Sequence, residues 1–155
     1  MKFLCDDNLG KLARYLRMLG YDTAFDSAIS DARLLAEMLK ENRFVLTRDN
    51  YLAKRIEPER HMLITDNNPE RQLQMVIEKL GLIIDKKGLF TICLECNRTC
   101  RQVTADDVAD KVFPYTVKTQ DKFTECPDCG RIYWRGSHYE DMIKKLQSIL
   151  GTAGF

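Results

Sequence analysis

Aspartates follow several apolar runs that have the composition of short buried strands. Asp6 and Asp7 come directly after the first run, Asp49 follows the run FVLTR, and Asp31 stands where a second helix is expected to begin. Ligands of an open parallel α/β sheet bind beyond the carboxyl ends of its strands, so we expect Asp6, Asp31 and Asp49 to converge there. Neighbouring carboxylates raise one another's pKa unless a cation lies between them. The pattern predicts a Mg²⁺ or Mn²⁺ site, and such an ion can activate water for phosphodiester cleavage.

Each acid also has a simpler interpretation. Ser30 or Asp31 can cap a helix, Asp49 can be a turn residue, and Asp7 can stabilise a helix N-terminus through the helix dipole. Asp66 follows another apolar run, HMLIT, and is a further candidate, as is Asp7. The joint placement of these acids at one expected sheet edge favours the metal-site interpretation.

Cysteines make up a second candidate site. Five of the six lie in the last part of the chain, where CLEC (residues 93–96) and CPDC (residues 126–129) form two C-x-x-C pairs. Each pair can present two thiolates to one tetrahedral Zn²⁺. We therefore predict a structural zinc site with the ligands Cys93, Cys96, Cys126 and Cys129. Four ligands close the coordination sphere, so this metal is assigned no catalysis. Cys100 is spare, with a buried apolar role as the alternative to ligation.

Cationic and aromatic side chains are candidates for binding a nucleic-acid backbone and its bases. Lys11, Arg14 and Arg17 share one side of an expected helix, opposite its leucines, and the segment GRIYWRGSH follows the second cysteine pair. The alternatives are a solvated helix face and aromatic side chains that pack the ribbon, which we favour for Trp134. The predicted substrate contacts are Arg14, Arg17, Arg48, Arg131 and Tyr133.

The elements that must position these residues follow from apolar periodicity. Strands are expected over 2–5, 23–25, 43–47 and 61–65, and they alternate with helices over 9–19, from about 31, and 69–80. Gly20 and Gly81 stand where helices should end. This alternation predicts a small parallel α/β sheet flanked by helices. Further helices are expected over 104–111 and 138–150, and residues 85–88 form the expected domain boundary.

Composition restricts the class of protein. The chain has 155 residues, is 45% hydrophobic and 30% charged, and carries a formal net charge of +1. An anionic partner must therefore be bound by a local patch rather than by an overall positive field. No apolar run approaches the ~20 residues of a membrane span, and the first residues do not have the pattern of a signal peptide. We expect a cytoplasmic protein without a membrane partner. In that reducing compartment, clustered cysteines indicate a metal site rather than disulfides.

Taken together, DDNLGKLARYLRMLGYDT, VLTRDN, the two C-x-x-C pairs and CGRIYWRGSH resemble the Mut-seven C-terminal (Mut7-C) ribonuclease domain family. The resemblance covers nearly the whole chain. It implies a PIN-like nuclease domain over 1–88, a zinc ribbon with a C-terminal helix over 89–155, and acidic residues that bind a divalent metal for RNA cleavage. By position, the acids of that family match Asp6, Asp31 and Asp49.

The interpretation that follows is a Mg²⁺- or Mn²⁺-dependent ribonuclease acting on RNA, preferably single-stranded, with a structural Zn²⁺. The alternative is a noncatalytic zinc-ribbon adaptor, RNA-binding or ribosome-associated, on a degenerate PIN-like scaffold. A toxin-like nuclease with a protein antitoxin is a third option, which no feature of the sequence supports. The sequence identifies no protein partner.

Overall fold

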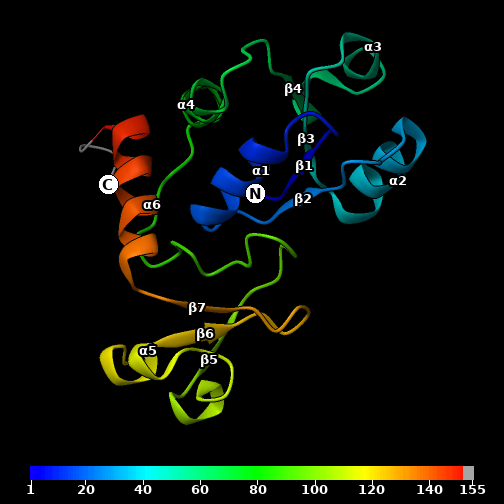
Figure 1. Ribbon diagram of the computed structural model, residues 1–155. Helices are drawn as coiled ribbons and strands as arrows, with labels where there is room; N and C mark the ends of the chain where they lie inside the picture. The colour runs from blue at the N-terminus through cyan, green and yellow to red at the C-terminus, as the bar shows by residue number, and fades with distance from the viewer. Residues whose placement is uncertain (152–155) are drawn as a thin grey trace.

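A four-stranded parallel sheet organises the N-terminal part of the chain (Figure 1). The computed structural model describes residues 1–151. The strands are β1 (Phe3–Cys5), β2 (Thr23–Phe25), β3 (Phe44–Thr47) and β4 (His61–Leu63), in the order β2-β1-β3-β4. Every neighbouring pair is parallel, so the predicted small parallel α/β sheet is confirmed.

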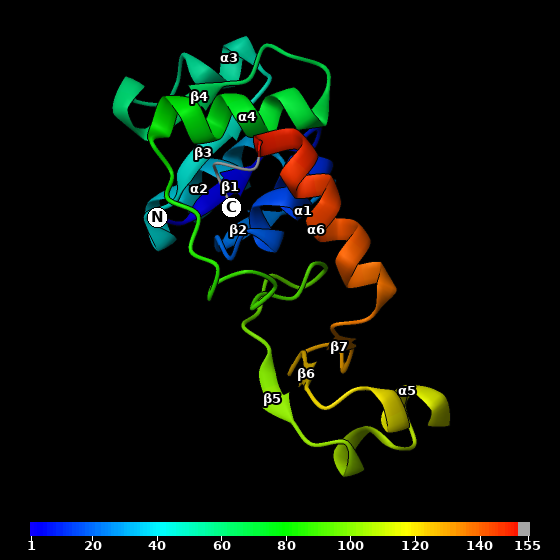
Figure 2. The ribbon, with the colours of Figure 1, turned by 90° about the vertical axis from the view of Figure 1, so that its left-hand side faces the viewer.

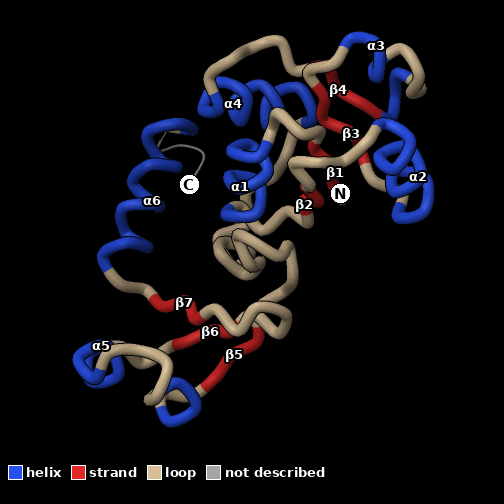
Figure 3. Tube along the Cα trace, turned by 45° about the vertical axis from the view of Figure 1, so that its right-hand side comes forward, coloured by secondary structure: helices blue, strands red, loops and turns tan. Residues whose placement is uncertain are grey.

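Helices connect the strands and cover both faces of the sheet (Figure 3). The Ser30 hydroxyl, rather than the Asp31 carboxylate, caps the second helix by accepting from the Arg33 N–H. Gly20 and Gly81 have positive φ angles just beyond two helices, as expected for C-terminal glycines. The helices are α1 (Gly10–Met18), α2 (Asp31–Glu41), α3 (Asn50–Ala53) and α4 (Pro69–Leu80), with a short 3₁₀ helix at Pro58–Arg60.

The alternation of side chains along β1 separates two cores. Phe3 and Cys5 are buried in the larger core, to which helices α1 and α4 contribute apolar side chains. Leu4 points to the opposite face and packs in a smaller core with Leu34 of α2 and Leu52 of α3. Successive side chains of a strand point to opposite faces, so three consecutive buried residues require cover on both sides of the sheet. The sequence pattern and the layered arrangement therefore agree.

The cysteine-rich part forms a separate three-stranded antiparallel sheet, β5-β6-β7. Its strands are β5 (Arg101–Val103), β6 (Phe123–Glu125) and β7 (Ile132–Trp134). The helix expected over 104–111 is wrong: the Thr104–Asp107 capping interaction forms, but only a 3₁₀ helix, Asp106–Val108, follows. Val108 is its one buried residue, too little apolar surface to hold a longer helix. An unexpected helix, α5 (Pro114–Thr119), begins instead with proline at its first position.

The last helix, α6 (Ser137–Leu150), returns from the ribbon to the first sheet's helices and lies beside α1 and α4 (Figure 2). Leu146 and Ile149 of α6 are buried in the same core as Phe3. The division into domains 1–88 and 89–155 stays a prediction, and residues 152–155 of the second lie outside the described residues. Within residues 1–151, no helix has both the length and the apolar character needed to span a bilayer.

Candidate functional site

The four predicted zinc ligands lie together. The sulfur atoms of Cys93, Cys96, Cys126 and Cys129 are all within 4.8 Å of one another, and the Cys93 and Cys129 sulfurs are 3.8 Å apart. Zn–S bonds of about 2.3 Å in a tetrahedron place neighbouring sulfurs roughly 3.8 Å apart. The donor set and its spacing therefore fit Zn²⁺. Cys100 is not in this group, which agrees with its interpretation as spare.

The surroundings of Cys93 favour its thiolate. Burial alone would raise the pKa of the Cys93 thiol, but hydrogen bonds from the Tyr133 hydroxyl and from the backbone N–H groups of Cys96 and Glu95 outweigh it and lower the pKa to about 7. Burial raises the pKa of the Tyr133 hydroxyl, so this group stays protonated and donates to the Cys93 sulfur 3.2 Å away. Donors to a ligating sulfur fix its orientation, so Tyr133 supports the cysteine site.

Arg17 attaches the turn that carries the first cysteine pair to the edge of β2. We call this turn, residues 93–97, the first cysteine knuckle. The Arg17 side chain is buried, and its guanidinium donates to the carbonyl oxygens of Thr23 (2.9 Å), Leu94 (2.8 Å) and Glu95 (3.0 Å). The predicted contact of Arg17 with substrate is therefore corrected: it joins α1, β2 and the knuckle. Arg17 is buried although it lies opposite the leucines of the helix, because the knuckle covers this side of α1.

Asn97 completes the attachment. Its side-chain oxygen accepts from the Thr23 N–H at 2.7 Å, and its amide donates to Asp22 at 2.5 Å. Asn97 has a φ angle of 58°, a conformation that asparagine tolerates better than most residues. The knuckle thereby satisfies backbone groups of an edge strand that would otherwise be open.

Asp6 is the most constrained of the acids at the carboxyl edge of the sheet. It is buried at the end of β1, where one carboxylate oxygen accepts from the Thr47 hydroxyl at 2.5 Å and from the Arg48 N–H at 2.7 Å. The other oxygen accepts from the Asn8 N–H at 3.2 Å. These bonds fix the carboxylate between the two central strands.

Asp49 stands at the end of the neighbouring strand, connected to Asp6 through one side chain. The Asp49 N–H donates to the same Thr47 hydroxyl, at 2.9 Å. Its carboxylate also caps α3, accepting from the N–H groups of Tyr51 (2.6 Å) and Leu52 (3.2 Å). The alternative interpretation of Asp49 as a turn residue is incomplete, because the same side chain is a helix cap and an exposed carboxylate at the sheet edge.

Asp31 is exposed at the start of α2 and forms an ion pair of 3.0 Å with Arg55. Among residues 1–151, the four cysteines are the group of side chains whose ligand atoms lie close enough together to hold one metal ion. Asp6, Asp31 and Asp49 do not form such a compact group in this structure. Asp7 bonds only to Asn8 among the described residues, so its carboxylate keeps further oxygen lone pairs for other ligands.

Two further acids follow the outer strands. Asp66, beyond β4, accepts from the Asn68 N–H and lies 3.8 Å from Arg71. Asp26, directly after β2, accepts from the Ala28 N–H and was not recognised in the sequence. Its signal was available, since Asp26 follows the run TAF in the same way that Asp6 follows FLC.

The remaining predicted substrate contacts are exposed or lie at the sheet edge. Arg14 and Arg131 both pair with Glu95, at 2.9 and 3.1 Å. Arg48 donates to Asn67, and among residues 1–151 its Nε is a buried side-chain nitrogen without a hydrogen-bond partner. The Tyr133 hydroxyl is occupied by Cys93, although its ring lines a pocket described below. The ring centroids of Trp134 and Phe123 are 6.4 Å apart, so Trp134 packs within the ribbon, as the packing interpretation predicts.

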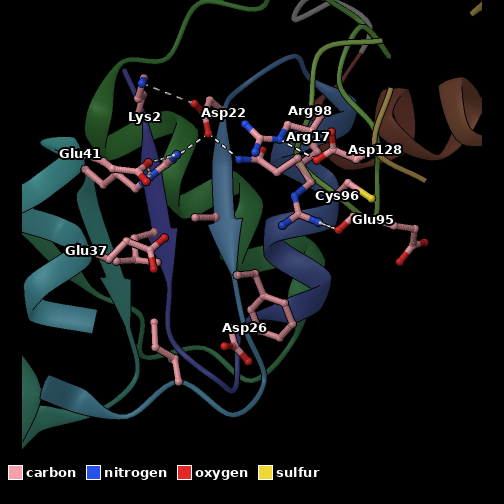
Figure 4. Close-up of a pocket in the computed structure, with 16 residues that line it drawn as sticks. Lys2, Arg17, Asp22, Asp26, Glu37, Glu41, Glu95, Cys96, Arg98 and Asp128 are labelled. Atoms are coloured by element: carbon pink, nitrogen blue, oxygen red, sulfur yellow. Dashed lines mark hydrogen bonds and ion pairs between the residues drawn. The ribbon is translucent and has the colours of Figure 1, made fainter. Parts of the chain in front are cut away.

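A polar cleft of about 370 Å³ separates α2 from the first cysteine knuckle (Figure 4). Arg43 crosses one end of it and pairs with Asp22 (2.7 Å) and Glu41 (2.6 Å), while Arg98 pairs with Asp128 (2.8 Å) at the other. Hydrogen bonds from Arg43 and Asn97 outweigh the cost of burial and lower the pKa of Asp22. The cleft is lined by six carboxylates and four cations, so its internal ion pairs leave a surplus of negative charge.

Family comparison fits these features. The sequence model of one protein family, described as the Mut7-C RNAse domain, matches residues 1–146. The chain belongs to the Mut7-C RNAse domain family. No curated protein and no solved structure matches it. The match spans both the first sheet and the ribbon, so both belong to the Mut7-C domain. Membership of this family indicates a ribonuclease-like function.

The residues that sequence reasoning missed are those that join distant segments. Asn97 directly follows a C-x-x-C pair and has a positive φ angle, but its partner Thr23 lies far away in sequence. Thr47 lies in the TRD segment, two residues before the recognised Asp49, and its hydroxyl donates to Asp6. Its position at the end of a strand expected beside that of Asp6 was the available signal. Nothing local to α6 shows that it would return to α1 and α4.

Proposed function

We propose that this Mut7-C domain hydrolyses RNA phosphodiester bonds in a reaction that depends on Mg²⁺ or Mn²⁺. The observation that carries the proposal is the connection of Asp6 and Asp49 through Thr47 at the carboxyl ends of the two central strands. Family membership supports the same reaction, since the matched description is that of an RNase domain.

The chain's own residues have distinct roles in this proposal. Asp6 and Asp49 supply oxygen donors, and Asp31 joins them after it leaves Arg55. Carboxylate oxygens suit Mg²⁺, which is often bound by one or two carboxylates together with substrate phosphate. When bound, the ion supplies Lewis-acid chemistry, activating water and neutralising charge that develops on the phosphate. Thr47 and the Arg48 N–H keep Asp6 oriented, and the Arg48 side chain is the nearest candidate in sequence for a phosphate contact.

A second candidate function is a noncatalytic RNA-binding adaptor. It is favoured by one observation: Asp6, Asp31 and Asp49 do not form a compact metal-ligating group among residues 1–151. The two functions differ in what the acids do, so substitution of the acids separates them.

The test compares cleavage of labelled single-stranded RNA by the zinc-loaded parent, Asp6→Asn and Asp49→Asn in Mn²⁺. We expect each substitution to reduce cleavage at least about 100-fold, the scale found when electrostatic groups are removed from an active site. Asp110→Asn is the matched control, because it removes the same charge from an exposed position on the ribbon. Zinc content and thermal melting show that the variants remain folded.

Asn can replace Asp as a helix cap, so Asp49→Asn should preserve α3. Cleavage by both variants at the parent's rate would show that these acids are not catalytic. A parent that binds RNA but does not cut it in Mg²⁺ or Mn²⁺ would favour the adaptor.

A further inference from the structure

The groove between α1 and α6 has a different character from the cleft of Figure 4. Two adjoining pockets, of about 230 and 210 Å³, share Arg14 of α1 and Met142 of α6. Because they share residues on both helices, they lie next to each other, and we consider them together. We name the pair the α1–α6 groove. Its outer pocket lies between the two helices, and its inner pocket reaches β7.

The rim of the α1–α6 groove is cationic. Its charged side chains are one carboxylate, Glu95, and four cations: Lys11, Arg14, Arg131 and Lys145. Glu95 pairs with both arginines, and Lys145 pairs with Glu70 of α4. Lys11 is exposed and forms no ion pair with another residue in the described range 1–151. The groove therefore has a surplus of positive charge, whereas the chain as a whole has a net charge of only +1.

The floor of the groove is apolar and partly aromatic. Tyr15, Met18 and Met142 form the floor of the outer pocket. Trp134 and Tyr139 line the inner pocket, and Trp134 remains 37% exposed. Stacking on aromatic rings and on arginine planes stabilises unpaired bases, and a cationic rim binds their phosphates. A duplex hides its base faces within the stack and would not use such a floor.

One end of the groove lies close to the acids. Helix α1 begins directly after them, and the Leu9 N–H donates to the Asp6 carbonyl oxygen at 3.2 Å. Lys11 lies in the first turn of α1 and Arg14 in the next, so the cations continue from the acid edge toward β7 of the ribbon. Figures 1 and 2 show α6 extending from the first sheet's helices down to β7.

We propose that the α1–α6 groove binds a segment of single-stranded RNA, with phosphates on Lys11, Arg14, Arg131 and Lys145 and a base against Trp134 and Tyr139. The inference rests on RNA as the ligand in the proposed function and names the path by which RNA approaches Asp6. The ribbon is then part of the RNA-binding surface rather than an appendage. The carboxylate-rich cleft on the other side of the knuckle repels the same chain.

The test uses the intrinsic fluorescence of Trp134, the one tryptophan in the chain. The zinc-loaded full-length protein is titrated with fluorescein-labelled oligouridylate, without added Mg²⁺ or Mn²⁺ so that cleavage is not involved. We expect Trp134 fluorescence to be quenched over the same concentration range in which the anisotropy of the RNA label rises. The matching RNA duplex should bind more weakly and quench less.

Charge variants locate the RNA. Lys11→Ala and Arg14→Ala should each weaken binding about tenfold, as expected for loss of a charged hydrogen bond. Each should also reduce the slope of log affinity against log salt by about 0.7, the value for one lost phosphate contact on a single strand. Lys40→Ala on α2 and Lys79→Ala on α4 are the matched controls, because they remove the same charge from exposed helix positions outside the groove.

The outcomes separate this inference from the catalytic proposal. RNA binding without quenching of Trp134, or equal losses in the control variants, would overturn the groove. Polyglutamate that competes as well as RNA would overturn it too and would indicate an acidic protein partner. Cleavage that survives Asp6→Asn, with binding still lost in Arg14→Ala, would reject the catalytic acids and leave the groove in place.

Discussion

The cysteine cluster of this chain and the aspartates that we propose as a metal site are assembled in different ways. The four sulfurs come from two short turns and already lie within 4.8 Å of one another. The aspartates come from three separate elements, and each has a local partner: Thr47 for Asp6, the α3 N–H groups for Asp49, and Arg55 for Asp31. The comparison teaches that the two cysteine turns present their four sulfurs to one common point, whereas each carboxylate at the strand ends is held by a partner of its own.

Loss of a zinc ligand should have the largest effect. Cys126→Ser removes one of four thiolates, and structural Zn²⁺ binding in zinc-finger peptides is worth about 10–16 kcal/mol, so we expect the ribbon to lose its fold. Hydrogen–deuterium exchange should show loss of protection over residues 93–134. Cys100→Ser is the matched control, since Cys100 lies outside the cluster, and should retain one zinc ion as measured by mass spectrometry of the metal.

The same experiment shows how far the ribbon's influence extends. The Thr23 N–H is bonded to Asn97, so its protection should fall with that of the ribbon. The amides of β3 are buried in the centre of the sheet and should keep theirs. Equal loss in β3 would contradict the comparison, because the ribbon and the sheet would then be one cooperative unit.

Arg17 and Arg14 provide the next test, because they lie on the same helix but differ in burial. Arg17→Met leaves three carbonyl oxygens without their donor, at a cost of about 3 kcal/mol or more in the free energy of unfolding. Arg14→Met breaks one exposed ion pair and should change it by less than about 0.5 kcal/mol. At about 2–4 °C per kcal/mol, thermal melting of the zinc-loaded variants resolves the difference. Equal melting temperatures would show that Arg17 does not anchor the knuckle.

Local patterns predicted the strands and helices of the first sheet. They did not predict the strands and short helices of the ribbon, nor the contacts between distant segments. The alternation of FLC, TAF and FVLT with helical repeats predicted all four parallel strands, and Cys93 to Cys129 were found from spacing alone. Arg17 was misassigned because helical periodicity separates the leucine face from the other faces without showing that another segment covers a second face. The same reason explains why Asn97 was missed and why α6 was not expected beside α1.

The α1–α6 groove is another feature that local patterns could not predict, because it lies between segments that are distant in sequence. Arg14 and Arg131 were recognised as basic residues, but Lys145 and Met142 come from a helix whose position no local pattern fixes. Aspartates at strand ends form an intermediate case. Asp6 and Asp49 could be placed at one edge because parallel strands share the direction of their carboxyl ends, yet their bond partners depend on how Thr47 is oriented.

The smallest expected effect comes from releasing Asp31. Its ion pair with Arg55 is about half exposed, with side-chain exposures of 51% and 52%, and such pairs contribute at most about 1 kcal/mol. If Asp31 must leave Arg55 to reach the ion, Arg55→Ala should lower the Mn²⁺ concentration for half-maximal RNA cleavage by about two- to fivefold. Lys54→Ala is the matched control, because it removes the same charge from the adjacent position, where the side chain lies over the Tyr51 ring instead. An unchanged Mn²⁺ requirement in Arg55→Ala, together with full activity of Asp31→Asn, would remove Asp31 from the site and leave Asp6 and Asp49 as its carboxylates.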